Sequence, residues 1–564
     1  MTPRKRLVGL GAFALTSALV LTACGSGGGE EPAEGESTGI VTISNGEPQN
    51  PLVGSRTNET EGGLVVQHLY SGLVYYDAEG VVHDEIAESI DSDDNQNWTV
   101  TIQDGWEWSD GTPVTADSFV DAWNWAAYGP NGASGASFFS SIEGYVEAQG
   151  VPEFDDDGKV SGMAEEPTAE TLSGLEVVSD TEFTVTLSQP ESDFPIRLGY
   201  SAYFPLPEVF FDDPAAFGTE PENTIVNGPY TLESWENESQ ISLVPNEAYE
   251  GPRQAQNGGL NFNVYTDENT AYADLQGGNL DILENVPASA MSTFEEDLGD
   301  NAVNEPSASF AAMTVPEWLP EFEGEAGLKR RQALSMAINR EQITETIFAG
   351  TRIPATDFTS PVIDGWTGEI PGNEVTEYNP EEAKKLWDEA NEEDPLADDY
   401  VLTIHTNTDS THADWVEATC NGYMNDLDIQ CEMTTYPTFD DFLNERNAGP
   451  GGEIDGLFRA GWSADYPSLQ NYLGPLYSSA ALAGSNDGRY ESEEFDAALS
   501  EAAGAESFEE ANELYNQAQE VLFQDLPAIP QWYYSTTAGH SDLVDNVEFG
   551  WDSMPLLYEV TKTE

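Results

Sequence analysis

Hydrophobic and polar positions follow two periodicities along this chain, and these predict its secondary structure. Apolar residues at helical spacing predict helices at 116–127, 270–276, 331–348, 380–390, 413–427, 493–503 and 508–524, and a helix running into a strand at 64–76. Alternation and short apolar runs predict strands at 40–43, 97–102, 182–187, 230–244, 260–264, 280–282, 401–405, 429–433, 529–534 and 547–550. Strands and helices alternate in two separated blocks, which indicates an α/β protein with at least two lobes.

Two further expectations concern one strand and one loop of this pattern. The strand at 40–43 is expected at the edge of a sheet. The stretch 129–173 is rich in Gly, Ser and acidic residues, and it is expected to be an inserted acidic loop. Its Asp155–Asp157 run lacks the alternate spacing of a calcium-binding loop, so we interpret it as a solvated turn.

The first residues are expected to lie outside the fold. Arg4-Lys5-Arg6 opens an otherwise uncharged apolar segment that ends at Ala23, and Cys24 follows. This pattern resembles a bacterial lipoprotein signal peptide, whose cleavage leaves the cysteine as a lipidated N-terminus. We therefore expect 1–23 to be removed, Cys24 to anchor the chain on the outer face of the cell membrane, and 24–39 to be a flexible acidic tether. An ordinary secretory signal is the alternative.

The composition is strongly acidic, with 104 Asp and Glu residues against 18 Lys and Arg and a formal net charge of −86. Repulsion from phosphate excludes nucleic acid as a general partner and disfavours adsorption to anionic lipid. Because the acids are spread along the whole chain, we interpret them as a solvated surface rather than as one binding patch. The hydrophobic content of 39% is sufficient for packed cores.

Two cysteines remain after Cys24, and an exported protein lies where disulfides persist. Cys420 falls in a predicted helix and Cys431 in the strand that follows, so a bond between them would join helix to strand across a short loop. A metal site would need further ligands, and the five scattered histidines do not supply them at suitable spacing. We predict a disulfide, no metal and no cofactor.

The segment Arg459-Ala-Gly-Trp-Ser-Ala-Asp-Tyr466 carries four kinds of binding group within eight residues. It follows a short apolar run interrupted by turn residues, so we expect it to lead from the end of a strand into a loop. Its groups could hold a zwitterion, with Asp465 accepting from an ammonium and Arg459 donating to a carboxylate. The alternative is an internal Arg–Asp ion pair that only fixes the loop.

Motifs for catalysis are absent from the sequence. It contains no Gly-x-Ser-x-Gly elbow, no phosphate-binding Gly-Lys-Ser/Thr loop and no His-Glu-x-x-His pair. Pairs of acidic residues are so frequent that no single pair points to acid–base chemistry. The chain is therefore not expected to be an enzyme.

Six motifs occur in a fixed order along nearly the whole chain. They are Trp108-Ser-Asp-Gly-Thr-Pro-Val-Thr-Ala-Asp-Ser-Phe119, Asn227-Gly-Pro-Tyr230, Asn246-Glu-Ala-Tyr249, Gly278-Asn-Leu-Asp281, Arg331-Gln-Ala-Leu-Ser-Met-Ala-Ile-Asn-Arg340 and Tyr378-Asn-Pro-Glu-Glu-Ala-Lys384. The series resembles the family-5 extracellular solute-binding proteins of ABC importers, the peptide/nickel class, and in particular their oligopeptide-binding branch. The resemblance implies a periplasmic-binding-protein-like fold of type II in its large three-domain form, with two lobes that close over a ligand.

The same resemblance implies how the chain is divided. Domain I would comprise 40–74, 190–283 and 536–564, domain II 75–189, and domain III 284–535. The ligand would lie between domains I and III. An insertion at Gly449-Pro-Gly-Gly452 departs from the family pattern and leaves the pocket shape and the length of the ligand open.

Roles for individual residues follow from the resemblance. In the oligopeptide-binding branch, the aspartate that matches Asp465 pairs with the α-ammonium of the peptide. The residue that matches Trp462 lines a side-chain pocket, and the one that matches Arg459 lies near the far carboxylate. His412 lies in a stretch similar to another carboxylate contact, with an ordinary helix-start histidine as the alternative. Tyr534 matches an aromatic that faces the ligand, with core packing as the alternative.

Two further candidates rest on the resemblance. Phe439 is one, in a loosely matching stretch. Gly62-Gly63-Leu64 lies where the family places a strand-like segment that pairs with the peptide backbone, and its glycines would permit close approach.

The implied function is that of a monomeric, lipid-anchored binding protein that captures oligopeptides and delivers them to ABC permease subunits and their ATPases. One alternative keeps the fold and changes the ligand to a nickel chelate, heme, a sugar or an opine. Another is a receptor for peptide signals that does not import them.

Overall fold

The computed structural model describes residues 39–154, 160–482 and 484–562 of the 564-residue chain. The predicted signal peptide, Cys24 and nearly all of the tether lie outside the described residues, as does the Asp155–Asp157 turn. The described residues form one compact unit. None of the described helices is both long enough and apolar enough to cross a membrane.

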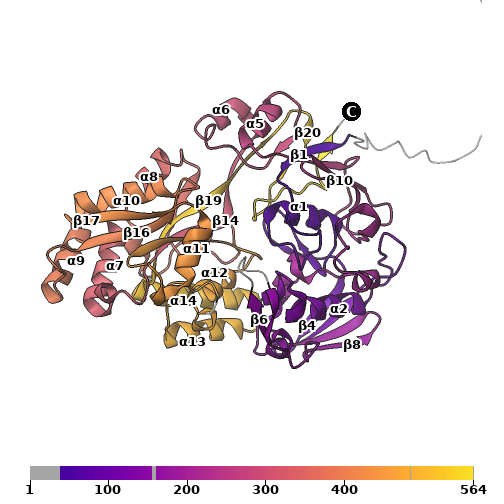
Figure 1. Cartoon of the computed structure of the whole chain (residues 1–564), viewed down its shortest axis with the longest axis horizontal. Helices are drawn as coiled ribbons and strands as arrows, with labels where there is room; N and C mark the ends of the chain where they lie inside the picture. The colour runs from indigo at the N-terminus through magenta and orange to yellow at the C-terminus, as the bar shows by residue number, and fades with distance from the viewer. Residues whose placement is uncertain (1–38, 155–159, 483, 563–564) are drawn as a thin grey trace, which may run out of the picture. The chain divides into compact units, whose positions relative to one another are not determined.

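The fold is built on a mixed sheet of 11 strands (Figure 1). In spatial order its strands are β10 (Tyr230–Glu236), β11 (Gln240–Pro245), β12 (Leu260–Val264), β1 (Val41–Asn45), β13 (Ile282–Leu283), β19 (Ala528–His540), β14 (Ala302–Thr314), β18 (Leu457–Ser463), β16 (Val401–Asn407) and β17 (Gln430–Tyr436), and β15 (Arg352–Pro354) pairs with β19 off this path. With the helices between its strands, this sheet confirms the α/β class.

The prediction of an edge strand at 40–43 is wrong. β1 lies inside the sheet, with β12 and β13 parallel to it on its two sides. Its apolar residues Val41 and Ile43 are fully buried, and the polar Ser44 and Asn45 are buried as well. These two side chains bond to backbone groups: Ser44 accepts from the Glu284 N–H at 3.0 Å, and Asn45 donates to the Glu61 carbonyl at 3.1 Å. The polar end of this interior strand is thus satisfied by hydrogen bonds within the chain.

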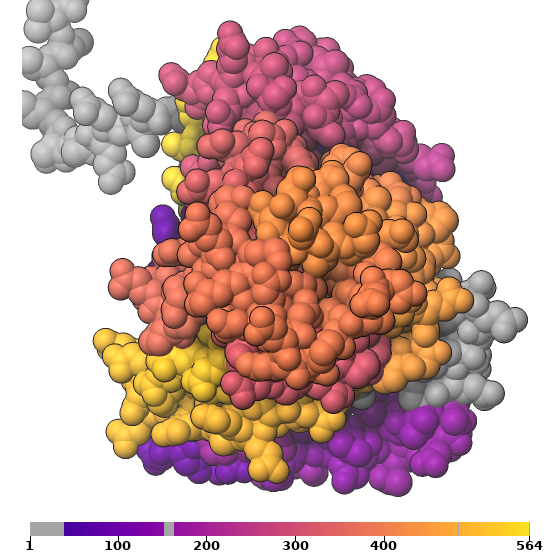
Figure 2. All heavy atoms as spheres, turned by 90° about the vertical axis from the view of Figure 1, so that its left-hand side faces the viewer, coloured from indigo at the N-terminus to yellow at the C-terminus, as the bar shows by residue number. Residues whose placement is uncertain are grey.

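Two long strands, β14 and β19, run between the two main hydrophobic clusters of the described residues. One cluster draws on residues 41–262 and on part of the C-terminal stretch, and the other mainly on residues 308–533. The pairing of β14 with β19 is irregular between Pro306 and Phe310, where the strands pass from one cluster to the other. The face drawn in Figure 2 is formed largely by the second half of the chain.

The remaining strands form small sheets. Four of them make one antiparallel sheet in the order β4 (Ala87–Ser92), β5 (Asn97–Ile102), β9 (Glu182–Thr186) and β8 (Leu175–Ser179). The others form pairs: β2 (Val74–Tyr76) with β3 (Val82–Asp84), β6 (Val151–Phe154) with β7 (Val160–Glu165), and β20 (Val544–Asp545) with β21 (Thr561–Lys562). The β6–β7 hairpin and the short helices before it show that 129–173 is not a simple loop. The strand predicted at 547–550 is only an isolated bridge between Phe549 and Pro555.

Each helix predicted from the sequence is present in the described residues. The helices are α1 (Thr60–Leu69), α2 (Ala116–Ala127), α3 (Tyr145–Gln149), α4 (Phe194–Arg197), α5 (Glu268–Gln276), α6 (Phe294–Leu298), α7 (Gly324–Met336), α8 (Arg340–Thr346), α9 (Pro380–Glu393), α10 (His412–Asp426), α11 (Phe439–Asn447), α12 (Gln470–Tyr477), α13 (Glu493–Ala503) and α14 (Phe508–Asp525). Of these, α3, α4, α6, α11 and α12 were not predicted. The single helix predicted at 331–348 is divided into α7 and α8. The division lies at Asn339, whose side chain accepts from the Gln342 N–H at 3.0 Å and so begins a new helix.

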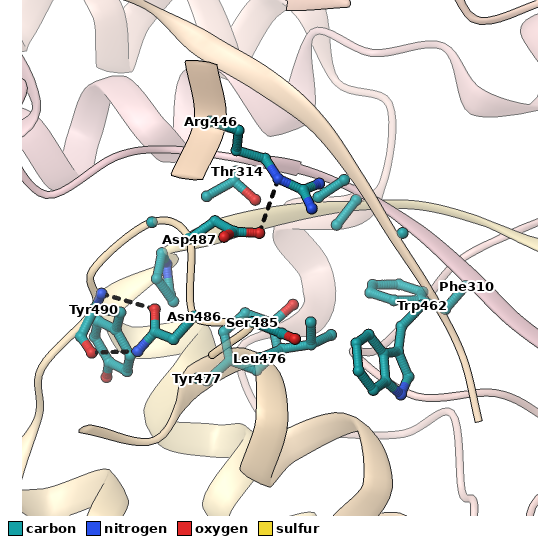
Figure 3. A pocket seen from close by; sticks show the side chains of 15 residues that line it. Phe310, Thr314, Arg446, Trp462, Leu476, Tyr477, Ser485, Asn486, Asp487 and Tyr490 are labelled. Carbon is teal, nitrogen blue, oxygen red and sulfur yellow. Dashed lines mark hydrogen bonds and ion pairs between the residues drawn. The ribbon is translucent and has the colours of Figure 1, made fainter. Parts of the chain in front are cut away.

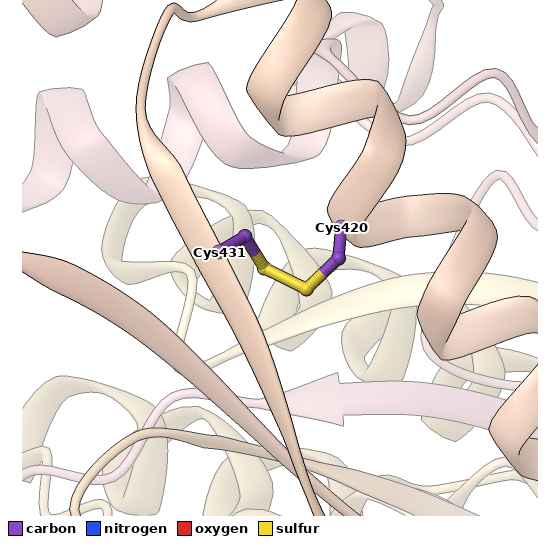
Figure 4. The surroundings of a disulfide bond; sticks show 2 residues. All are labelled: Cys420 and Cys431. Atoms are coloured by element: carbon purple, nitrogen blue, oxygen red, sulfur yellow. A yellow bond between two sulfur atoms is a disulfide. The ribbon is translucent and has the colours of Figure 1, made fainter.

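The predicted disulfide is confirmed. Cys420 of α10 and Cys431 of β17 are bonded, with their Cα atoms 5.2 Å apart (Figure 4). The bond ties α10 to the outer strand of the large sheet, and β16 lies next to that strand. It therefore stabilises the region that carries His412 at the start of α10.

Candidate ligand-binding site

The segment Arg459–Tyr466 begins in a strand and leaves it after Ser463, so the prediction that it leads from the end of a strand into a loop is confirmed. β18 extends to Ser463 and pairs with β14, because Ala460 and Gly461 fit close to the neighbouring strand. Successive residues of a strand point to opposite faces, so Arg459 and Trp462 point away from one another. The segment therefore contributes to two groups of side chains rather than to one.

The first group is centred on Asp465, just after β18. Its organiser is Asn471, at the start of α12. The side-chain oxygen of Asn471 accepts from the Trp462 indole N–H at 3.1 Å and from the Asp465 backbone N–H at 2.8 Å. The Asn471 amide nitrogen in turn donates to the Asp465 carboxylate at 3.4 Å. One amide thus fixes both the indole and the carboxylate that were predicted to bind ligand.

Asp465 is a largely buried carboxylate without a cation beside it. Among the described residues no ion pair joins it to Arg459 or to any other base, so the alternative of an internal Arg–Asp pair is not what the structure shows. Burial raises the pKa of Asp465 to about 6, and the hydrogen bond from Asn471 only partly opposes this. Burial raises the pKa of Tyr200, and the charge of Asp465 raises it further, so this phenol lies close to Asp465.

A cavity opens beside Trp462. It holds about 580 Å³ of space, part of it open to solvent. Phe310 and Trp462 lie on one side of the cavity, and Arg446 and Asp487 face each other on the other side (Figure 3). These two charges form an ion pair at 2.9 Å, and both side chains are largely buried. The cavity therefore combines aromatic walls with an electrically balanced polar end.

The second group surrounds Arg459. Its guanidinium lies over the Phe439 ring at 4.6 Å and over the Phe442 ring at 5.2 Å. Its Nε donates to the Asn407 side-chain oxygen at 2.7 Å, while the Asn407 amide donates to Asp409. Desolvation lowers the pKa of Arg459 to about 10, so the guanidinium remains charged at neutral pH. Contacts through the ring faces leave the edge of the guanidinium available for an acceptor.

His412 and Tyr534 belong to this second group. Burial lowers the pKa of His412 to about 4, and the charges of Arg459 and Arg352 lower it as well. The Trp415 indole N–H donates to Nδ1 of His412 at 3.2 Å. The imidazole is therefore neutral at pH 7, and a neutral ring that accepts at Nδ1 carries its proton on Nε2. Arg352 lies 4.2 Å from the centre of the Tyr534 ring.

Phe439 begins α11 and is held against this group. Its backbone N–H donates to the Asp409 carboxylate at 2.8 Å, and its ring is 38% exposed. Of the predicted contacts, the structure thus brings Arg459, His412, Tyr534 and Phe439 together. It places Asp465 and Trp462 in a separate group.

Gly62, Gly63 and Leu64 join neither group, and the expectation of a strand-like segment there is wrong. All three lie in the first turns of α1, where the Gly63 N–H donates to the Glu59 carbonyl at 3.0 Å. Leu64 is fully buried in the first hydrophobic cluster. A Cβ on Gly62 would lie 2.6 Å from Cγ2 of Thr57, so its glycine serves packing within the chain. A contact of this segment with ligand stays a prediction.

A second cavity, of about 570 Å³, lies in the region of the first cluster. Its buried arginine, Arg253, is fully engaged: Nε donates to Glu85 at 2.9 Å, and the terminal nitrogens donate to Glu85, to the Ser71 hydroxyl and to two backbone carbonyls. Such saturation is typical of a structural ion pair. No group of three potential metal ligands occurs in the described part of the chain.

Sequence reasoning missed Asn471, Arg352 and Asn407. Asn471 and Asn407 bind nothing by themselves, and they matter only through the side chains that they hold. Arg352 carried a usable signal, because the scarcity of cations that singled out Arg459 applies to Arg352 equally. Its place beside Tyr534 depends on the pairing of β15 with β19, which the sequence does not reveal.

A family model describes most of this architecture. Residues 81–484 match the family described as bacterial extracellular solute-binding proteins, family 5 middle. The chain belongs to this family. Among its relatives, the periplasmic oligopeptide-binding protein OppA of Escherichia coli strain K12 is 26% identical over 480 residues, covering 83% of this chain and 82% of OppA. The oligopeptide-binding protein OppA of Bacillus subtilis strain 168 is 25% identical over 534 residues, covering 92% of each chain.

Solved structures in this family share the fold. The unliganded open form of the periplasmic murein tripeptide-binding protein MppA superimposes with a TM-score of 0.77 at 22% identity. The match covers 94% of this chain and 98% of that structure. The predicted family and the periplasmic-binding-protein fold are therefore confirmed.

Proposed function

We propose that this chain captures oligopeptides for an ABC importer, with Asp465 as the partner of the peptide ammonium. The observation that carries the proposal is the state of Asp465: a largely buried carboxylate that no cation of the described chain neutralises. A buried charge without a partner is costly, and a ligand ammonium would remove that cost. The names of the relatives support a peptide as the ligand.

The two groups of side chains together complement a zwitterion. Asp465 accepts from the amino end, and Arg459 with the Nε2–H of neutral His412 donates to the carboxyl end. Trp462 and the adjoining cavity offer room for a side chain of the peptide. Because the Arg446–Asp487 pair is already balanced, side chains of different polarity can enter without leaving an unpaired charge.

The domain organisation follows as part of the proposal. We assign the three domains at the boundaries predicted from the sequence, with the ligand between domains I and III. The hinge would include the irregular stretch of β14 and β19, where the strands pass from one hydrophobic cluster to the other, although on β14 this stretch lies within the predicted domain III. A lipid on Cys24 would hold the monomer at the outer face of the membrane, and the closed form would deliver the peptide to permease subunits driven by ATPases.

Calorimetric titration of peptides tests the role of Asp465. Trialanine to pentaalanine with free amino ends are compared with the same peptides carrying an N-acetyl group. Both acetylation and the Asp465→Ala change are expected to weaken binding by at least about 2 kcal/mol, the scale for stripping one partner from a buried charge pair. Asp388→Ala, at an exposed carboxylate paired with Lys384, serves as the matched control and should leave the affinity unchanged.

Three results would contradict the proposal. Equal affinity for free and acetylated peptides would show that the peptide ammonium does not pair with Asp465. Binding of a nickel chelate, heme, a sugar or an opine in place of any peptide would keep the fold and replace the ligand. A peptide-binding protein whose bound peptide is never taken up by cells that also produce the permease would be a signal receptor.

A further inference from the structure

Arg352 is a second arginine that meets the Arg459 group, and it comes from a different part of the fold. It lies on β15, directly opposite Tyr534 in the pairing with β19. Its guanidinium lies 4.2 Å from the centre of the Tyr534 ring and 5.4 Å from that of Phe348. Aromatic rings thus hold the flat faces of this cation, and an edge is the side that an acceptor approaches.

The donors of Arg352 are largely unused within the chain. One terminal nitrogen donates to the carbonyl of Thr351 at 2.7 Å. The buried Nε has no hydrogen-bond partner, and no ion pair involves Arg352 among the residues that the structure describes. The chain has 104 acidic residues against 18 Lys and Arg, yet among the described residues Arg352, like Arg459, has no carboxylate within ion-pair distance.

A structural arginine of this protein looks different. Arg340 is fully buried among backbone oxygens, and its nitrogens donate to the carbonyls of Pro530 at 2.8 Å and Thr376 at 2.7 Å. They also donate to the Ser335 hydroxyl at 3.0 Å. Arg352 lacks this saturation. Arg331 shares the unpartnered Nε, but its terminal nitrogen bonds to the Phe322 carbonyl, outside the Arg459 group.

Arg352 and Arg459 share one neighbourhood. The charges of both depress the pKa of His412, which lies between β16 and the body of α10. Asp409 partly compensates Arg459, to which it is linked through Asn407. Among the described residues, no carboxylate compensates Arg352 in the same way. A ligand that places a single carboxylate on Arg459 and His412 would leave the charge of Arg352 unmatched.

We propose that Arg352 binds an acidic side chain of the peptide, at or next to its carboxyl-terminal residue. The inference rests on the proposed function, since it concerns the same ligand and the same group of side chains. Peptides that end in glutamate or aspartate would place one carboxylate on Arg459 and a second on Arg352. The preferred class of ligand is then an oligopeptide with an acidic carboxyl end.

Matched peptides test this preference. Peptides of three to five residues are built from alanine with a final Glu or Gln, two side chains of nearly equal size and different charge, and their dissociation constants are measured by calorimetry. The native protein should bind the Glu peptides at least about tenfold more tightly, the scale of one charge-assisted hydrogen bond. Arg352→Gln should abolish this ratio, so that Glu and Gln peptides bind with equal affinity.

Two further variants serve as controls for the contact of Arg352 with the peptide. Arg331→Gln removes another partly buried arginine, one that bonds to the Phe322 carbonyl outside this group, and should keep the Glu preference intact. Arg352→Glu should reverse the selection, so that peptides ending in Lys bind more tightly than those ending in Glu. Melting temperatures of all variants establish that the proteins compared are folded.

The outcomes separate this inference from the proposed function. The inference is wrong if the native protein binds Glu and Gln peptides equally, or if Arg352→Gln keeps the preference for Glu peptides. Arg352 then does not bind the acidic side chain, while the proposed peptide binding is unaffected. If no peptide of any kind binds, the proposed function itself is wrong. A lost ratio in Arg352→Gln together with a reversed ratio in Arg352→Glu would establish the contact.

Discussion

At the scale of single residues, Asp465 shows how a binding site can weaken the fold that carries it. Its pKa rises from the ordinary 3.8 to about 6 because the ionised form is desolvated. A shift of this size corresponds to roughly 3 kcal/mol lost when the folded protein keeps the charge at neutral pH. Most residues of a natural protein agree with its fold, and local conflicts of this kind gather at functional sites.

The Asp465→Asn variant should therefore be more stable than the native protein at neutral pH and without ligand. The destabilisation is fully present above pH 6, where the folded-state carboxylate is ionised, and it fades as the pH falls toward 3.8. Thermal unfolding at pH values of about 7.5 and about 4 should thus show a large gain at the higher pH and a small one at the lower. A loss of stability at neutral pH would contradict this account of Asp465.

At the scale of elements, the meeting of β18 with α12 determines the geometry around Asp465. β18 delivers the Trp462 indole and the start of the loop, and α12 delivers Asn471, which bonds to both. Neither element alone positions the carboxylate. Asn471 acts by positioning, and its removal should change a measurable property of Asp465 as well as the affinity for ligand.

The Asn471→Ala variant should bind peptide about tenfold less tightly, because a buried hydrogen-bonded network is lost. The Asn471 amide also lowers the pKa of Asp465, so removing it should move that pKa above 6. Since ammonium binding needs the ionised carboxylate, the native affinity should fall as the pH drops below 6, and the variant should begin to lose affinity at a higher pH. Calorimetry across pH measures both midpoints, and identical midpoints would contradict the role given to Asn471.

Elements also show how far the sequence could predict this structure. The helix α2 has the predicted bounds because Thr115 and Ser118 form a capping box at its start, a signal that is purely local. β14 was not predicted, because its first half is polar and contains Pro306, and pairing with β19 decides its conformation.

The residues of the candidate site also divide into those that the sequence could predict and those that it could not. Asp465 and Arg459 were found because their side chains have the chemistry of binding. The strand-like conformation expected at 62–64 was wrong because these residues lie in a helix, where Gly62 packs closely against Thr57. Arg352 was missed because strand pairing places it in the site, and that pairing joins residues 352–354 to 532–534. Contacts between distant segments are what the sequence alone did not reveal.

At the scale of the whole molecule, the net charge of −86 opposes the folded state. Charges of one sign repel each other most in the compact form, and dissolved salt screens them. The screening length falls from about 30 Å at 0.01 M to about 3 Å at 1 M salt. The acidic surface is therefore expected to make stability depend on ionic strength.

The melting temperature should accordingly rise between about 0.01 M and about 1 M sodium chloride, as screening relieves the repulsion. An equal osmotic strength of sucrose serves as the control, because it strengthens burial without screening charge. A melting temperature that rises with sucrose and stays constant with salt would show that the acidic residues do not strain the fold.

The most direct test of the account as a whole is native mass spectrometry of residues 25–564, mixed with an equimolar set of tripeptides to hexapeptides. We expect adducts at peptide masses, enriched in peptides that have an acidic carboxyl end and a free amino terminus. We also expect that Asp465→Ala removes these adducts, while Asp388→Ala keeps them. Absence of peptide adducts from the native protein, or an equal set of adducts on Asp465→Ala, would contradict the account.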